Sequence, residues 1–215
     1  MPFISCRRYY LDKVLTETSF QGKILDVGGK KDNKRGDFRP PLDTVDTWEY
    51  LNIDGSTNPD YNCSADHIPV DNDSFDTLLL AEVLEHLEKP DDVLRECHRV
   101  LKKGGKLVAT MPFLNPVHAD PYDFQRWTDV KIKDTFVNCG FNNINIRPMG
   151  GVFAVIYDLL YVSLGSASKN RRAFKNRLIN KVFMPPLAKL FLWLDQKYIY
   201  KSERITTGYY IEAGK

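Results

Sequence analysis

The sequence predicts an α/β protein in which helices cover both faces of a mostly parallel sheet. Short apolar segments alternate with segments of helical spacing over residues 23–149, which is typical of a parallel sheet with helical crossovers. The early apolar segments stop at turn-forming pairs, Gly28-Gly29 and Asp54-Gly55. The chain has 215 residues, of which 43% are hydrophobic and 27% are charged, a globular composition. We therefore expect one domain, residues 1–215, and exclude a disordered chain or a polytopic membrane protein.

The first half of the chain is expected to supply three strands. Residues 1–20 are a short amphipathic lead-in. Strands are then predicted at 23–27, 49–54 and 75–83, and the apolar run in the last is that of a strand buried on both faces.

The second half continues the alternation as far as residue 149. A helix is predicted at 90–103, because Pro90 suits its first turn and Lys102 and Gly104 suit its end. The remaining predicted elements are a strand at 106–113, a helix at 129–141, a strand at 142–149 and a final strand at 206–215. Residues 150–200 break the alternation and predict two or three helices, so we expect a helical insertion at 150–204 before the last strand.

Charge is distributed unevenly along the chain. Residues 1–149 hold 19 basic and 24 acidic side chains, whereas residues 150–215 hold 11 basic and 4 acidic side chains. The net charge of +7 on the C-terminal part indicates contact with a polyanion or an anionic membrane. No run of about 18 apolar residues is present to form a membrane-spanning helix.

The cysteine pattern favours a reducing compartment. The four cysteines, at positions 6, 63, 97 and 139, form no CxxC motif, and the N-terminus lacks the apolar core of a signal peptide. We expect a cytoplasmic protein without a metal site.

The carboxyl ends of the strands are where parallel sheets bind ligands. There, Asp26 precedes a tight turn at Gly28 and Gly29, and Asp54 follows the next strand, where a carboxylate suits two ribose hydroxyls. The full GxGxxG pattern is absent, so a ligand with a ribose but no pyrophosphate fits better.

A longer segment carries a specific resemblance. Residues 63–113 contain SADHIPV, SFD, VLEH and VLKKGGKLV, in the order typical of class I S-adenosylmethionine-dependent methyltransferases, the type 11 branch in particular. The chain resembles this family over residues 22–149. The resemblance implies S-adenosylmethionine as cofactor and a Rossmann-like, seven-stranded sheet whose last strand, here 208–213, is antiparallel.

The resemblance also assigns roles by position. Asp26, Gly28 and Gly29 would contact the methionine half of the cofactor, and Asp54 would hold the ribose. Glu82 would line the floor of the cofactor site.

Two positions depart from the family pattern. Lys30 stands where the family usually has glycine, so the turn is less open. Ala65 would face the adenine, but the acid that usually precedes it is replaced by Ser64, and Asp66 follows instead.

The segment at 112–128 leaves the fifth strand of that family sheet at the methyl-transfer end. His118 is the predicted base, because an alcohol becomes a good nucleophile only as its proton leaves. Asp120 or Asp123 would orient its ring, and Arg126 would pair with a phosphate or carboxylate on the acceptor. The alternative for Asp123 and Arg126 is an ion pair that only stabilises the loop.

These residues predict methyl transfer to a hydroxyl of a small-molecule or glycan acceptor. The segment at 112–128 resembles one found in methyltransferases of bacterial surface glycans. This resemblance favours a role in polysaccharide biosynthesis, with a phosphate-bearing or lipid-linked acceptor. The alternatives are an RNA or small-amine acceptor, or a non-catalytic partner subunit. Residues 150–200 are expected to form a cap over the site or a homodimer surface. The second interpretation of this segment is peripheral contact with the inner membrane. Nucleic-acid binding is less favoured, because no RNA-binding module is present.

Overall fold

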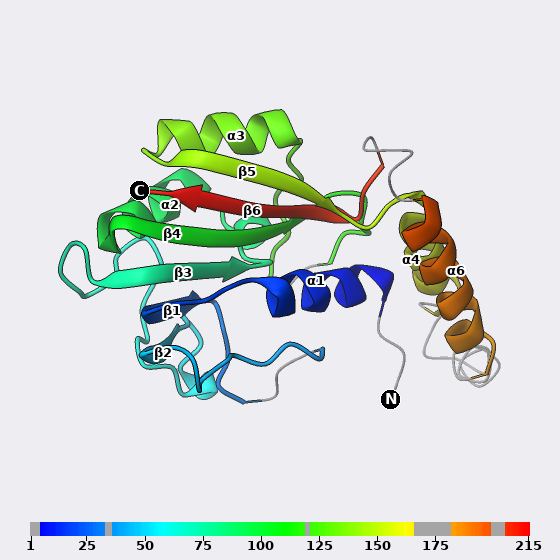
Figure 1. Ribbon diagram of the computed structural model, residues 1–215, viewed down its shortest axis with the longest axis horizontal. Helices are drawn as coiled ribbons and strands as arrows, with labels where there is room; N and C mark the ends of the chain where they lie inside the picture. The colour runs from blue at the N-terminus through cyan, green and yellow to red at the C-terminus, as the bar shows by residue number, and fades with distance from the viewer. Residues whose placement is uncertain (1–4, 33–35, 119–120, 166–181, 199–204) are drawn as a thin grey trace.

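The computed structural model describes residues 5–32, 36–118, 121–165, 182–198 and 205–215. Its sheet has the strand order β2-β1-β3-β4-β6-β5 (Figure 1). The strands are β1 Lys23–Val27, β2 Thr47–Leu51, β3 Phe75–Ala81, β4 Leu101–Pro112, β5 Asn142–Met149 and β6 Gly208–Gly214. Strands β2, β1, β3 and β4 are parallel, and β6 is antiparallel to both of its neighbours. The mostly parallel sheet and the antiparallel last strand are confirmed.

The strand count implied by the resemblance is wrong for the described residues, which form six strands and not seven. Beyond β2 there is only a single bridge between Leu51 and Tyr61. The Asp60 carboxylate accepts from the Tyr50 N–H (2.8 Å), and the Tyr50 carbonyl accepts from the amides of Asp60 and Tyr61. The outward backbone groups of Tyr50 are thus satisfied by the following loop and not by a further strand.

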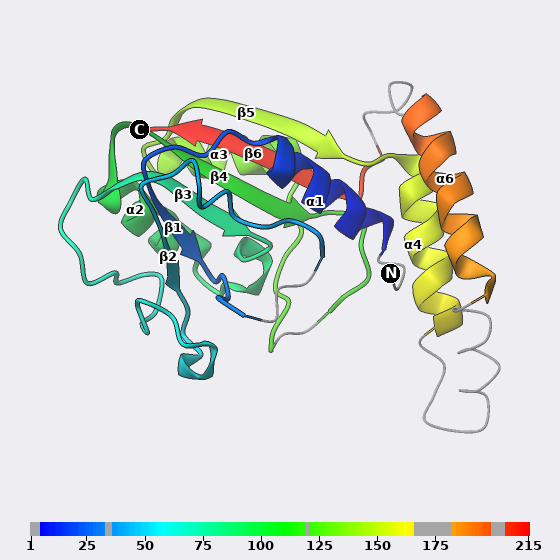
Figure 2. The ribbon, with the colours of Figure 1, turned by 60° about the horizontal axis from the view of Figure 1, so that its bottom comes forward.

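Helices cover both faces of the sheet, as predicted (Figures 1 and 2). Helices α2 Pro90–Val100 and α3 Asp129–Asn138 pack on one face through one buried apolar cluster. Helix α1 Cys6–Glu17 packs on the other face through a second cluster, which includes Ile24, Leu79 and Val108. Short 3-10 turns η1 Gly55–Thr57 and η2 Leu84–His86 follow β2 and β3.

Several predicted boundaries differ from the structure: β2 is Thr47–Leu51 and not 49–54, β3 ends at Ala81 and not at 83, and α3 ends at Asn138 and not at 141. The largest difference is at the end of α2. Helix α2 ends at Val100 and β4 begins immediately at Leu101, five residues earlier than expected. Leu101 is fully buried and pairs with Phe75, and Lys102 pairs with Asp76 (2.8 Å). These cross-strand contacts outweigh the helical spacing that the sequence carries through residue 103.

The helical segment before β6 contains α4 Val152–Gly165 and α6 Met184–Tyr198, which lie side by side beyond the end of the sheet (Figures 1 and 2). Asp158 of α4 accepts from the N–H groups of Cys6 and Arg7 at the start of α1. Asp195 of α6 accepts from the Tyr10 hydroxyl, tying the same helix to α6. Residues 169–177, which carry five lysine and arginine side chains, lie outside the described residues. Among the described residues, no helix is long and apolar enough to cross a membrane.

Candidate active site

The turn after β1 is rigid and closely packed. Gly28 has φ of +80°, a conformation that L side chains rarely adopt. A Cβ on Gly29 would lie 2.3–2.5 Å from the Asp26 carboxylate, so only glycine fits there. Asp26 is itself buried and accepts from the Trp48 indole N–H (3.4 Å).

Asn52 braces this turn from the end of β2. Its side-chain amide donates to the carbonyls of Gly28 and Gly29 (3.1 and 3.0 Å), and its Oδ1 accepts from the Asp54 N–H (2.9 Å). The glycine turn and Asp54 are therefore held together by one buried side chain.

Asp54 lies exposed to solvent beside this turn. Its Oδ1 accepts from the hydroxyl and the N–H of Ser56 (2.6 and 3.0 Å). These hydrogen bonds, with the nearby Lys30 ammonium, hold the pKa of Asp54 below its usual value. The carboxylate is therefore ionised at neutral pH and able to accept from ribose hydroxyls.

Ser64, Ala65 and Asp66 lie in a turn between β2 and β3. The Ser64 carbonyl accepts from the His67 N–H (3.2 Å), and Glu96 of α2 holds the turn by accepting from the Ile68 N–H (2.7 Å). Ser64 and Asp66 are exposed, whereas Ala65 is half-buried against the core.

Glu82, directly after β3, has an unusual backbone conformation, with φ of +59°. Its N–H donates to the Thr110 Oγ1 (3.1 Å), and its carboxylate accepts from the same hydroxyl (3.2 Å). The carboxylate also contacts the Arg7 guanidinium of α1. A non-glycine residue held at positive φ is a form of strain that concentrates at functional sites.

Glu85 is the most unusual group at this edge. Its side chain is fully buried, and both carboxylate oxygens lack a hydrogen-bond partner. Its Oε1 lies 3.6 Å from His86 Nε2 and 3.8 Å from His118 Nε2. Burial raises the pKa of Glu85, against the opposing effect of its own backbone N–H and of the charges of His86, Arg7 and Arg126.

His118 is held beside Glu85 by the loop after β4. Its N–H donates to Asp123 Oδ2 (2.8 Å), and burial, together with Arg7, lowers its pKa below the ordinary value. Its ring is therefore neutral at pH 7, with a nitrogen lone pair available.

Asp123 and Arg126 form the ion pair that the alternative interpretation expected. Arg126 Nη1 contacts Asp123, and Nη2 donates to its Oδ2 (2.7 Å). This pairing lowers the pKa of Asp123 to about 2. Asp120 lies outside the described residues.

Sequence reasoning missed three residues of this edge: Arg7, Asn52 and Glu85. Glu85 stood next to His86 in the VLEH motif, within the strand-end region singled out for chemistry, but its full burial is visible only in three dimensions. Arg7 carried no local signal, because it reaches the edge from α1, more than 70 residues before Glu82 in the chain.

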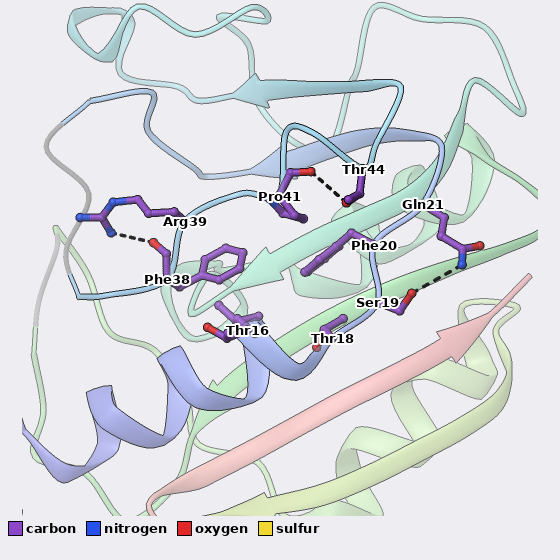
Figure 3. Close-up of a pocket in the computed structure, with 10 residues that line it drawn as sticks. Thr16, Thr18, Ser19, Phe20, Gln21, Phe38, Arg39, Pro41 and Thr44 are labelled. Carbon is purple, nitrogen blue, oxygen red and sulfur yellow. Dashed lines mark hydrogen bonds between the residues drawn. The ribbon is translucent and has the colours of Figure 1, made fainter.

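A hollow elsewhere on the molecule has a different character. Figure 3 shows it between the end of α1 and the segment 38–44, lined by Thr16, Phe20, Phe38, Arg39 and others. The Arg39 guanidinium donates to the Gly36 and Phe38 carbonyls. Of the two regions, only the strand-end edge joins a glycine turn to buried acids and histidines, so the candidate site is placed there.

Comparisons with known proteins bear on the fold and on the enzyme class. Residues 45–109 match the family model Methyltransf_11, described as a methyltransferase domain. The solved phosphoethanolamine N-methyltransferase 2 of Haemonchus contortus, bound to S-adenosyl-L-methionine, superposes with a TM-score of 0.58 at 16% identity, covering 100% of this chain and 54% of that one. A SAM-dependent methyltransferase from Archaeoglobus fulgidus superposes with a TM-score of 0.54 at 16% identity, covering 97% and 94%. The fold is that of the SAM-dependent methyltransferases.

The same fold also serves other chemistry. The [4+2]-cyclase SpnF superposes with a TM-score of 0.57 at 17% identity, covering 97% of this chain and 80% of that one. A fold by itself therefore does not settle the reaction.

Curated relatives match in sequence as well. The ubiquinone/menaquinone biosynthesis C-methyltransferase UbiE of Bartonella henselae is 28% identical over 109 residues, 48% of this chain and 35% of the relative. The demethylmenaquinone methyltransferase of Alkalihalophilus pseudofirmus is 26% identical over 137 residues, 50% of this chain and 56% of the relative. The match thus spans about half or less of these relatives. Together the comparisons support the predicted enzyme class and the predicted cofactor.

Proposed function

We propose that the chain is a SAM-dependent methyltransferase that transfers a methyl group to a hydroxyl of a small-molecule or glycan acceptor. The observation that carries this proposal is the buried, unpartnered Glu85 carboxylate facing His118 at the same sheet edge as the glycine turn. Buried carboxylates without partners are costly and mark functional sites.

The cofactor site is proposed to lie along the ends of β1, β2 and β3. Gly28 and Gly29 allow a ligand to approach the backbone, and Asp54 accepts from the ribose hydroxyls. Asp26 and Lys30 border the methionine half, and Glu82 lies at the floor. Ala65, with Ser64 and Asp66 on either side, is proposed to contact the adenine. When bound, the cofactor supplies a methyl group on a cationic sulfonium, which is a good leaving group.

The protein must then remove the hydroxyl proton as the new C–O bond forms. His118 Nε2 is proposed to take this proton, and the neighbouring Glu85 carboxylate stabilises the charge that develops on the imidazole. Asp123 and Arg126 position the loop that carries His118, because their ion pair also holds the His118 N–H. Asp120 is proposed to assist in orienting the ring.

Two measurements test this function. Calorimetric titration with S-adenosylhomocysteine should show one site per chain with a micromolar dissociation constant. Transfer of labelled methyl from S-adenosylmethionine to a panel of nucleotide sugars and glycans should then give an alkali-stable methyl ether, and His118→Ala should lower kcat by 10²–10⁴-fold. Absence of cofactor binding would instead favour a non-catalytic partner subunit.

A carbon acceptor is the second candidate, because both curated relatives act on quinone precursors by name and UbiE is named a C-methyltransferase. Carbon methylation also requires loss of a proton, so the same base would serve. Product analysis separates the two, since a C-methyl product resists ether cleavage. An amine or RNA acceptor would be indicated if His118→Ala retained nearly the full rate.

We also propose that helices α4 and α6 contact an anionic membrane, in keeping with a lipid-linked acceptor and a peripheral position at the cytoplasmic surface. Both helices leave large apolar side chains exposed, among them Leu159 (48%), Leu190 (49%) and Trp193 (54%). Lys197 lies over the Trp193 ring, 4.9 Å from its centre, so a cation accompanies the aromatic group. Together with the net charge of +7 on residues 150–215, this combination suits an interfacial site.

Flotation with vesicles tests the membrane proposal. The protein should float with phosphatidylglycerol vesicles, and Trp193→Ala with Leu190→Ala should lower the recovered fraction several-fold. Equal recovery with and without anionic vesicles would contradict it. A dimer in light scattering that the same variants dissociate would assign the surface to a second copy instead.

A further inference from the structure

The group formed by Glu85, His86 and His118 has the composition of a metal-binding site. Each residue offers one ligand atom, and the three atoms lie within 4.8 Å of one another. They come from two segments that are far apart in the chain, the turn after β3 and the loop after β4. Glu85 Oε1 lies between the two imidazoles, at 3.6 Å and 3.8 Å from their Nε2 atoms.

The Glu85 carboxylate is the first sign of a missing ligand. It is fully buried, and neither oxygen has a hydrogen-bond partner. The two arginines whose charges act on it are paired elsewhere, Arg7 with Glu82 and Arg126 with Asp123. A buried carboxylate without partners is expected to be protonated or to coordinate a cation.

The environment of His86 prepares its Nε2 for coordination. Its Nδ1 lies 2.5 Å from the Tyr122 carbonyl, an acceptor, so the ring proton is on Nδ1. The Nε2 lone pair is therefore free and points toward Glu85. A carbonyl that holds the other ring nitrogen is the usual outer contact of a metal-binding histidine.

His118 lies on the other side of Glu85. Its Nδ1 lies 3.3 Å from the Pro116 carbonyl and 3.5 Å from Asp123 Oδ2, which are acceptors, and 3.4 Å from Asn115 Nδ2 and from Arg126 Nη2, which are donors. Coordination through Nε2 requires the tautomer whose Nδ1–H donates to the Pro116 carbonyl, and Nε2 then faces Glu85 with its lone pair. The two rings meet edge to face, with their centres 5.3 Å apart, and the three candidate ligand atoms lie within 4.8 Å of one another.

We propose that Glu85, His86 and His118 bind one divalent transition-metal ion of the Zn²⁺ class. Two imidazole nitrogens and one carboxylate oxygen favour borderline ions such as Zn²⁺ over Mg²⁺ or Ca²⁺. Bonds of about 2.0–2.2 Å in tetrahedral geometry place ligand atoms roughly 3.4 Å apart. The two Glu85–histidine separations, 3.6 Å and 3.8 Å, are within a few tenths of an ångström of this value, and the separation between the two histidine nitrogens is at most 4.8 Å, so the two rings must approach each other to complete the site.

The site has three protein ligands and therefore an open fourth position. Such a position takes water or a substrate oxygen and lowers the pKa of the group bound there. With the ion bound, the His118 Nε2 lone pair is a ligand, so the ion would replace His118 in promoting loss of the acceptor hydroxyl proton, which would pass to solvent water; only this consequence rests on the proposed function. Binding of the ion itself is tested without cofactor or acceptor.

Metal binding is measured on tag-free protein stripped with a chelator and dialysed. Titration with Zn²⁺ in the calorimeter should show one ion per chain. Glu85→Gln, His86→Ala and His118→Ala should each weaken binding at least tenfold, while the control His67→Ala, which removes an exposed histidine outside the group, should bind as the wild type does. Circular dichroism and S-adenosylhomocysteine titration establish that each variant is folded.

Co²⁺ substitution gives a readout that does not depend on variants. The wild-type protein should show the intense visible bands of four-coordinate cobalt, and Zn²⁺ should remove them. Less than one ion per chain, six-coordinate cobalt bands only, or a loss of binding in His67→Ala equal to that in His86→Ala would overturn the proposal. Metal binding without methyl transfer would leave the site intact and reject the proposed reaction.

Discussion

Replacing Asp195 by alanine should remove hydrogen bonds that join α6 to the start of α4 and one that joins α6 to α1. The Asp195 carboxylate accepts four hydrogen bonds: from the Tyr10 hydroxyl (2.7 Å) and from the N–H groups of Gly151 (2.8 Å), Phe153 (3.0 Å) and Ala154 (3.1 Å). The three amides belong to the start of α4, where a helix has no partners of its own for its N–H groups. Asp195 thus caps α4 from a neighbouring helix.

The magnitude follows from burial. Tyr10, Gly151 and Ala154 are buried, and a buried donor left without an acceptor costs about 1–3 kcal/mol. Water that enters the space left by the carboxylate satisfies part of this demand. We therefore expect Asp195→Ala to lower the free energy of unfolding by about 4 kcal/mol, in the range of severe substitutions.

Guanidinium denaturation followed by circular dichroism measures this loss, and amide hydrogen exchange at Gly151 and Ala154 shows where it arises. Lys189→Ala, an exposed change on the same helix, is the control and should stay within about 0.5 kcal/mol of wild type. A loss below about 1 kcal/mol for Asp195→Ala, or unchanged exchange at the two amides, would refute the capping argument.

Three further predictions concern other parts of the molecule. Asp54→Ala should weaken S-adenosylhomocysteine binding at least tenfold in calorimetry, because hydrogen bonds to a charged group contribute about 1.5–3 kcal/mol, whereas the exposed Asp43→Ala should not. Gly29→Ala should lower the unfolding midpoint and abolish cofactor binding, since the new Cβ would collide with the Asp26 carboxylate; a wild-type melting curve would contradict this. Burial raises the pKa of Asp158 to about 6, and the negative charge of Asp195 acts in the same direction. The N–H groups of Arg7 and Cys6 and the positive charge of Arg7 act in the opposite direction. The folded state therefore binds more protons than the unfolded state between about pH 4 and 6. The contribution of Asp158 to the free energy of unfolding falls by about 3 kcal/mol as the pH rises through that window, and it does not change at higher pH. Asp158→Asn should remove this slope in the wild-type-minus-variant difference of unfolding free energy.

Local patterns predicted most of the fold correctly. Strand β1 occupies the predicted residues 23–27, because an apolar run closed by two glycines has one reasonable interpretation. The boundary at Leu101 could not be predicted, since Leu101 continues the spacing of a helix and also fits the start of a strand. The choice is made by Phe75, which is distant in sequence and pairs with Leu101.

The sequence suggests only part of the candidate site. Asp26, Gly28 and Asp54 follow from their places at strand ends, which a pattern of strands reveals. The group around Glu85 depends on burial and on the meeting of two distant segments, and neither property is written in local spacing. The expectation of no metal site rested on cysteine spacing alone, which is silent about a site built from one carboxylate and two histidines.

The contacts at the start of α1 connect helix α4 to the candidate site at the edge of the sheet. Asp158 of α4 holds the amides of Cys6 and Arg7, and the Arg7 guanidinium contacts Glu82 at the edge of the sheet. A membrane surface that binds α4 and α6 would therefore also fix the distance and orientation of Glu82 and its neighbours relative to that surface. Selection among acceptors would then depend on how far the target atom stands from the surface that anchors it, in addition to how well it fits the site.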